Sequence, residues 1–374
     1  MTPARAIPKG GDLTVVVQYA GIPSSVKVSG FTGWTRTSDG ALAVNEPESA
    51  WWWFPSNDHP TDKATYDVSV LVPDDVQAIS NGTLTGGPVK ELNGWDRWSW
   101  RSAKPQATYL TFLAVGHYDI ESDTAADGSP IVNAYSTSLG EFDGAARASV
   151  NRTNEVIETE ENWFGDYPFE AQGGCGGSAG GPRVRAGDTD PAVYGRAVLA
   201  SRRQHLRGGA RAGAPVFGDS VSLGQWRDIW LNEGFASYAE WLWSDHEGEG
   251  TPQELFDYTY ASYPEDDPFW QVLPGDPGAD KVFDGAVYDR GALTVQALRV
   301  QIGDEAFFEL LRTWLASHRY GDGTTGEFIA LAEKISGQQL DSLFDTWLFT
   351  AGARTCRRPR SWPGRRSRTP MRRR

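Results

Sequence analysis

Histidine and cysteine, the nitrogen and sulfur ligands of zinc sites, are rare in this chain of 374 residues, which has five His and two Cys. Its two cysteines cannot form a thiolate cluster. A catalytic zinc site takes two histidines four residues apart on a helix, as in His-Glu-x-x-His, and a third ligand elsewhere. The histidines of this chain are His59, His117, His205, His246 and His318. Since no two of them have that spacing, they do not form such a pair.

One glutamate lies within a strongly helical pattern. The pattern runs from 225 to 245 and has apolar residues at steps of four, three and four, namely Leu231, Phe235, Tyr238 and Leu242. Glu233 lies off this apolar stripe. Taken alone, the stripe indicates a glutamate that faces solvent, which is the common situation for a charged residue on a helix.

The string around Glu233 is long enough to change that interpretation. Trp230-Leu231-Asn232-Glu233-Gly234-Phe235-Ala236 resembles the aminopeptidase N family of zinc metallopeptidases, and the resemblance implies that Glu233 is the third zinc ligand. Val287-Tyr288-Asp289-Arg290-Gly291-Ala292 resembles the catalytic-tyrosine segment of that family and implies that Tyr288 is catalytic. Residues 53–66 look like its N-terminal β domain, and residues 217–221 resemble the segment after its metal site. The resemblance covers about 12–172 and 217–352.

The family motif His-Glu-x-x-His is missing from its expected place. In the family, eighteen residues separate its second histidine from the ligand glutamate, so counting back from Glu233 reaches Ala210, Arg211 and Ala214. The chain therefore lacks both histidine ligands and the general-base glutamate at the positions that the resemblance implies.

The segment that should hold the motif has an unusual composition. Residues 173–216 contain seven Arg, eleven Gly, two Asp and no Lys or Glu, and residues 354–374 contain ten Arg and no acid. The remaining 309 residues carry 18 basic and 47 acidic side chains. One interpretation is a flexible Gly-rich linker and a solvated basic tail. The other is translation out of frame.

The genetic code favours the second interpretation for residues 209–216. One choice of codons for this stretch is GGC GCA CGA GCT GGC GCA CCA GTG, and reading it one base later gives Ala-His-Glu-Leu-Ala-His-Gln and the start of Trp. In the same shifted frame, residues 183–192 permit Gly-Phe-Ala-Leu-Glu-Thr-Gln-Thr-Arg-Pro, which resembles the amine-binding segment of the family. Two active-site motifs in one frame and in the right order predict a frameshift.

The resemblance implies a mechanism for an intact relative. Zinc held by two His and one Glu lowers the pKa of a bound water and polarises the scissile carbonyl. The base glutamate takes the water's proton, and the tyrosine hydroxyl stabilises the oxyanion. The substrates are peptides with a free N-terminus, cleaved one residue at a time. For this chain as written we expect weak or no zinc binding and no peptidase activity.

The order of strand and helix patterns predicts an α+β protein. Residues 1–140 read as an antiparallel β domain, and its abrupt start at a strand over Leu13–Tyr19 suggests that a first portion is missing. Strands are also expected at 68–72 and 109–115, with hairpin turns at Asn81-Gly82 and Asn93-Gly94.

Residues 141–352 are expected to form a thermolysin-like, mainly helical catalytic domain. Helices are predicted over 145–164, 225–245, 292–302 and 304–318, then after the capping-box pair Thr324 and Glu327, and around 340–347. Residues 353–374 are expected to be a disordered Arg-rich tail.

Composition excludes several classes of protein. A net charge of −14 argues against a general nucleic-acid binder, which needs a basic surface. No apolar run reaches 18 residues, so no transmembrane segment is predicted. No signal peptide is evident, which suggests a cytoplasmic protein as written, whereas a lost start would allow a secreted origin.

Two other functions remain open. A catalytically dead relative could still bind peptides. A carbohydrate-binding β module is suggested by Trp51-Trp52-Trp53 and by the group Trp95, Trp98 and Trp100, since exposed aromatic rings stack on sugars. The alternative for these tryptophans is packing in the core.

Overall fold

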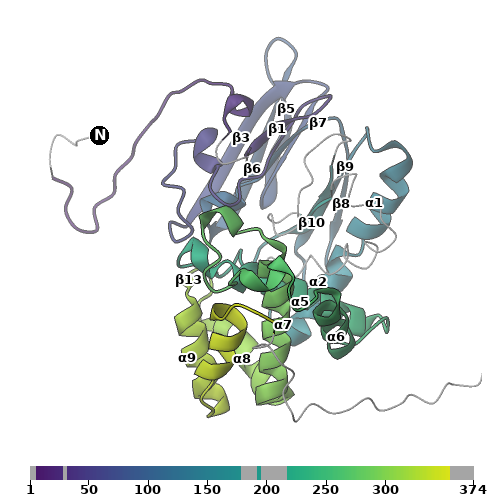
Figure 1. Ribbon diagram of the computed structural model, residues 1–374. Coiled ribbons are helices and arrows are strands. Elements are labelled where there is room, and N and C mark those ends of the chain that lie inside the picture. The colour runs from purple at the N-terminus through teal and green to yellow at the C-terminus, as the bar shows by residue number, and fades with distance from the viewer. Residues whose placement is uncertain (1–5, 28–31, 178–191, 195–216, 354–374) are drawn as a thin grey trace, which may run out of the picture.

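The chain folds into a β-rich first part and a helical second part (Figure 1). The computed structural model describes residues 6–27, 32–177, 192–194 and 217–353. Antiparallel sheets dominate up to residue 136, and helices dominate from residue 230 onward. The predicted α+β class with a β domain before a helical domain is confirmed.

A three-stranded antiparallel sheet forms the outer layer of the β-rich part, in the order β3-β6-β5. Its strands are β3 (Ala64–Pro73), β5 (Thr83–Lys90) and β6 (Trp95–Gln106). Trp98 and Trp100 alternate with polar residues along β6 and are 6% and 2% exposed. The turn at Asn93-Gly94 joins β5 to β6 with positive φ at both residues, so this predicted hairpin is confirmed.

A second antiparallel sheet packs against the first, in the order β1-β2-β7-β4. Its strands are β1 (Trp34–Arg36), β2 (Ala41–Ala43), β4 (Gln77–Ser80) and β7 (Leu113–Gly116).

The hairpin predicted at Asn81-Gly82 is wrong, because β4 pairs with β7 while β5 pairs with β6. The turn exists, but it carries the chain from one layer to the other. The strand predicted over 109–115 is only partly formed, since residues 108–110 make a 3-10 turn before β7.

A third sheet draws strands from both sides of residue 140, in the order β11-β10-β9-β8. Its strands are β8 (Tyr118–Thr124), β9 (Pro130–Ser136), β10 (Gln172–Gly176) and β11 (Ala192–Tyr194). The β8–β9 pair is antiparallel, and β10 runs parallel to β9 and β11. The domain boundary at 140 stays a prediction.

The single helix predicted over 145–164 is two helices, α1 (Asp143–Val150) and α2 (Thr153–Phe164). The break has a local cause. The Tyr135 hydroxyl donates a hydrogen bond of 2.6 Å to Asn151 Oδ1, which ties Asn151 to β9. The Thr153 hydroxyl then donates to the carbonyl of Val150 across the break.

The helical part contains the other predicted helices and one over Pro252–Ser262 that the sequence did not predict. They are α5 (Trp230–His246), α6 (Pro252–Ser262), α7 (Gly285–Ile302), α8 (Asp304–Ser317), α9 (Thr325–Ser336) and α10 (Asp341–Phe344). The capping box at the start of α9 is confirmed, since Thr324 and Glu327 exchange hydrogen bonds and Gly337 ends the helix with φ of 66°. Within the described residues, no helix combines the length and apolar character needed to cross a membrane.

The strand predicted over Leu13–Tyr19 is absent from the structure. These residues are extended and exposed, and Figure 1 shows them in an arm that leads away from the body of the protein. The alternating pattern is real, but a β-strand is completed only by a neighbour that accepts its backbone hydrogen bonds. No neighbour pairs with it in the described part of the chain.

Three side chains join the β-rich part to the start of the helical part. Lys63 Nζ donates to the carbonyls of Asp219 and Ser220 at 3.1 and 2.8 Å. The Tyr109 hydroxyl donates to the carbonyl of Gly218 at 2.6 Å. The Ser222 hydroxyl donates to the carbonyl of Pro60 at 2.7 Å, so residues 218–222 are held from the β side at several points.

The buried amine of Lys63 predicts a pH-dependent stability. Desolvation lowers its pKa to about 8, against the opposing charges of Asp219 and Asp322. The folded state then loses its proton near pH 8, whereas the unfolded state keeps it up to about pH 10.5. Since the unfolded state binds more protons in that window, stability should rise there by at most about 1.4 kcal/mol per pH unit.

The Lys63→Met variant should lack this contribution. Its free energy of unfolding, measured by urea titration from pH 7 to 10.5, should rise less steeply than that of the unmodified chain. Lys281→Met removes an exposed lysine and serves as the control with the same change of charge. Parallel curves for the unmodified chain and Lys63→Met would contradict the prediction.

Candidate active site

Glu233 is buried in the first turns of α5. It is 2% exposed, although the apolar stripe of the helix alone indicated a solvent-facing side chain. The reason is that α5 is covered on nearly all sides: Leu231, Asn232 and Phe235 are buried as well. A glutamate inside the protein is uncommon, because removing a carboxylate from water is costly.

The helices that carry Glu233 and Tyr288 touch through their backbones. A Cβ added to Gly234 would lie 2.9 Å from the Cα and C atoms of Gly291, and one added to Gly291 would lie 2.8 Å from the Cα of Gly234. Glu233 adjoins this contact on α5, and Tyr288 lies three residues before it on α7. Tyr288 and Gly291, three residues apart, share one face of α7. The contact between Gly234 and Gly291 therefore holds Glu233 and Tyr288 near the same end of the α5–α7 pair.

Tyr288 is half-buried near the start of α7 and packs against the helical core. Asp284 caps the helix by accepting a hydrogen bond from the Ala286 amide. Two residues after Tyr288, the guanidinium of Arg290 is fully buried. It donates to backbone carbonyls of Trp270, Val272, Thr346, Trp347 and Thr350. These bonds fix α7 against the C-terminal turns, and with it the position of Tyr288.

Sequence reasoning missed a buried tyrosine near Glu233. Tyr109 comes from the β-rich part, and Asn232 Nδ2 lies 3.5 Å from its hydroxyl. Burial raises the pKa of Tyr109 well above its ordinary value, and the charges of Glu46, Asp219 and Glu233 raise it further. Tyr109 therefore stays a neutral donor in acidic surroundings. No spacing pattern could have revealed it, since its partners are more than a hundred residues away.

The described residues do not form a metal site. No group of three or more His, Cys, Asp or Glu side chains in the described ranges could hold a metal ion. Of the histidines placed there, His117 lies between Asp39 and Asp75, and His318 packs on Trp314. The positions of Ala210, Arg211 and Ala214, like His205, fall outside the described residues. A single buried glutamate does not fit a catalytic zinc, which needs three protein ligands.

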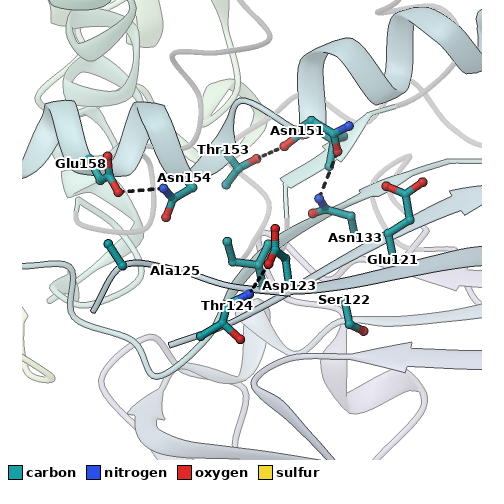
Figure 2. A pocket seen from close by; sticks show the side chains of 13 residues that line it. Glu121, Ser122, Asp123, Thr124, Ala125, Asn133, Asn151, Thr153, Asn154 and Glu158 are labelled. Carbon is teal, nitrogen blue, oxygen red and sulfur yellow. Dashed lines mark hydrogen bonds between the residues drawn. The ribbon is translucent and has the colours of Figure 1, made fainter. Parts of the chain in front are cut away.

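A polar cleft lies elsewhere, between the β8–β9 hairpin and helices α1 and α2 (Figure 2). Its volume is about 550 Å³, and its lining contains neither Glu233 nor Tyr288. Several polar groups there bond to one another: Asn133 donates to Asn151 and Asn154 donates to Glu158 (Figure 2). The cleft is separate from the predicted site.

The tryptophans give little support to a sugar-binding face. Trp98 and Trp100 lie in the core between two sheets. Trp53 packs at a tilt against Trp34 and edge-to-face against Phe54, and its Nε1 donates to Asn45 Oδ1. Trp51, at 53% exposed, and Trp95, at 41%, are the accessible ones.

Two family profiles match the chain. The profile described as "Peptidase M1 N-terminal domain" matches residues 8–110, and "Peptidase family M1 domain" matches residues 216–347. Glutamyl aminopeptidase of Rattus norvegicus is 27% identical over 347 residues, which is 86% of this chain and 36% of that protein. Probable aminopeptidase 2 of Sulfurisphaera tokodaii is 24% identical and covers 80% of this chain and 40% of that protein. The chain thus spans 36% and 40% of the length of these two curated relatives.

Solved structures show the same architecture. A two-domain M1 zinc metallopeptidase bound to L-tryptophan has a TM-score of 0.72 and 26% identity, and the match covers 85% of this chain and 71% of that one. The M1 zinc metallopeptidase of Deinococcus radiodurans has a TM-score of 0.71 at the same identity and coverage.

The glycine contact between α5 and α7 predicts a strong effect of one methyl group. Gly234→Ala places a Cβ inside the backbone of α7, so the helices must separate, and we expect a loss of about 1–3 kcal/mol in unfolding free energy. Gly326→Ala is the matched control, because Gly326 lies in α9 with open space around its Cα. It should be neutral or stabilising by up to about 1 kcal/mol. Chemical denaturation measures both, and equal effects would contradict the close contact.

Proposed function

The chain belongs to peptidase family M1, and from that premise we propose that it is a zinc aminopeptidase whose metal site is interrupted by a frameshift over residues 173–216. The family consists of hydrolases that act on peptide bonds. What carries the proposal is Glu233, a carboxylate buried in α5 at the position where the family has its third zinc ligand.

The surroundings of Glu233 support this assignment. Tyr288 lies on the helix that α5 crosses at Gly234, and it occupies the family's position for the oxyanion-stabilising hydroxyl. Residues 217–222, which directly follow the aberrant segment, are bound to the β-rich part through Lys63 and Tyr109. The segment that follows the missing motif is therefore held in a fixed place beside Glu233, which supports the proposal.

The chain as written does not complete that site. The positions of the two histidines and the general base hold Ala210, Ala214 and Arg211. Alanine has no donor atom, and a guanidinium does not accept a proton from water near neutral pH. We therefore propose that this chain binds zinc weakly or not at all and does not hydrolyse peptides. An in-frame chain would act on peptides with a free N-terminus, the substrate class implied by its aminopeptidase relatives.

The proposal predicts a difference between two genes. One encodes the chain as written, and the other removes a base before codon 183 and adds a G before codon 217, which restores His-Glu-x-x-His. After dialysis against metal-free buffer, the restored protein should hold about one zinc per chain and the original almost none. Elemental analysis measures the zinc, and an aminoacyl p-nitroanilide reports aminopeptidase activity.

Two variants of the restored chain test the residue roles. Glu233→Gln should lose most of the zinc, because a ligand is removed. Tyr288→Phe should keep the zinc and lose about a hundred- to a thousandfold in kcat, since only a transition-state hydrogen bond is lost. A full zinc complement and aminopeptidase activity in the original chain would overturn the proposed loss. A DNA read across codons 170–218 of the source organism tests the frameshift itself: an extra or missing base would restore His-Glu-x-x-His, whereas agreement with the sequence as written would make the lesion real.

A further inference from the structure

The arm formed by Leu13–Tyr19 exposes a complete β-strand pattern. Val15 and Val17 are 44% and 47% exposed, and Val16 is 81% exposed. No residue from Leu13 to Val26 is charged. In an extended chain, Leu13, Val15, Val17 and Tyr19 face one side, while Thr14, Val16 and Gln18 face the other. The arm is thus an amphipathic strand without a sheet in the described part of the chain.

The same molecule carries a long sheet edge that is open. Strand β3 pairs with β6 along one side, and no described strand pairs with its other side. Its inward-facing residues are less buried than those of its neighbour: Tyr66, Val68 and Val70 are half-buried, whereas Trp98 and Trp100 on β6 are buried. The apolar layer under the sheet therefore stays open beyond β3, as it would if one more strand belonged there.

Other edges fit a further strand less well. The free edge of β5 is interrupted by Gly86, Gly87 and Pro88, and its pairing with β6 shifts register there. Strands β1 and β4 have only three and four residues. The free edge of β8 carries Glu121 and Asp123, which would lie beside an apolar strand. Among the described strands, β3 thus has the longest uninterrupted free edge.

The two patterns match residue by residue. The arm has four inward positions, Leu13, Val15, Val17 and Tyr19, and β3 has four, Tyr66, Val68, Val70 and Val72. One antiparallel register aligns all four pairs, with Leu13 beside Val72 and Tyr19 beside Tyr66. On the outer face this register puts Val16 beside Ser69. Antiparallel pairing is also the commoner arrangement in proteins.

The root of the arm directs it away from its own β3. Residues 23–25 form a 3-10 turn in which the Ser25 hydroxyl donates to the carbonyl of Ile22. The Arg36 side chain donates to Ser24 at 3.2 Å, which ties this turn to β1. Figure 1 shows the arm leaving the body of the protein from there.

We propose that the arm of each copy adds as an antiparallel strand to the β3 edge of a second copy, so that two chains form a dimer by reciprocal strand exchange. Each exchange buries the apolar side of one arm beside the half-buried valines of β3 and satisfies backbone groups of both strands. The two-fold symmetry makes both contacts identical and closes the assembly at two chains.

Sedimentation velocity of the full chain over a range of micromolar concentrations tests the proposal. We expect a monomer–dimer equilibrium. Val15→Lys places a charge on the buried side of the arm and should raise the dissociation constant by about tenfold or more, since the contact occurs twice. Val16→Lys is the matched control, because its side chain lies on the solvent side. A sedimentation coefficient of a monomer at all concentrations would overturn the proposal, as would equal effects of the two variants.

A disulfide cross-link tests the register and identifies the partner. One chain carries Val16→Cys and a second, differently tagged chain carries Ser69→Cys, both with Cys356→Ser. Mixing under mild oxidation should join the two tags, because directly opposed residues bring their Cβ atoms to about 5 Å. Val16→Cys mixed with Val70→Cys is the control, since Val70 faces the other side of the sheet. A disulfide formed only when both cysteines lie in one chain would show that the arm folds back on its own β3, and would overturn the exchange.

Discussion

The direct contact between Gly234 and Gly291 sets the distance between the two helices that carry the predicted site. With a Cβ on either residue 2.8–2.9 Å from the opposite backbone, no side chain fits between α5 and α7 at this point. Glu233 precedes one glycine and Tyr288 lies one turn from the other, so backbone geometry governs their relation. Trp230 and Phe235, on the same stretch of α5, are both buried, and Trp230 Cβ lies 3.9 Å from the position of a Cβ on Gly291. A backbone contact is less adaptable than a side-chain contact, because no rotamer change can absorb an added atom.

The β-rich part acts on this helix pair through residues 218–222. Tyr109 donates to Gly218 and lies next to Asn232, while Lys63 donates to the two carbonyls that follow. A Cβ on Gly218 would lie 3.0 Å from the Asn232 side chain, so this segment also lies tightly on α5. The β-rich part therefore lies along one side of the predicted site. Removing it would release the segment that connects the aberrant stretch to Glu233.

The sequence predicts local features of this fold well and non-local ones poorly. The capping box at Thr324 and Glu327 and the turn at Asn93-Gly94 depend on residues a few positions apart, and both are confirmed. Asn81-Gly82 and the strand over Leu13–Tyr19 depend on which strands pair, which no local pattern encodes. The burial of Glu233 could not be predicted from the sequence pattern either, because the apolar stripe of α5 does not indicate which neighbours cover the opposite face of the helix. The family resemblance pointed to Glu233 and Tyr288, but their roles stay predictions until they are measured.

A protein can lose the activity of a site and keep its fold when the residues that carry out the chemistry differ from those that form the core. The core of the helical part is formed by aromatic and aliphatic side chains such as Trp230, Phe307 and Trp314, which are buried in one cluster. Glu233 contributes differently: a leucine of similar size would fill its position without the cost of burying a carboxyl group. Arg290 is also buried, yet it is satisfied by five carbonyls and supports the fold directly. The hydrogen bonds of Arg290 account for its burial, and the zinc-binding role proposed for Glu233 would account for the cost of burying its carboxyl group.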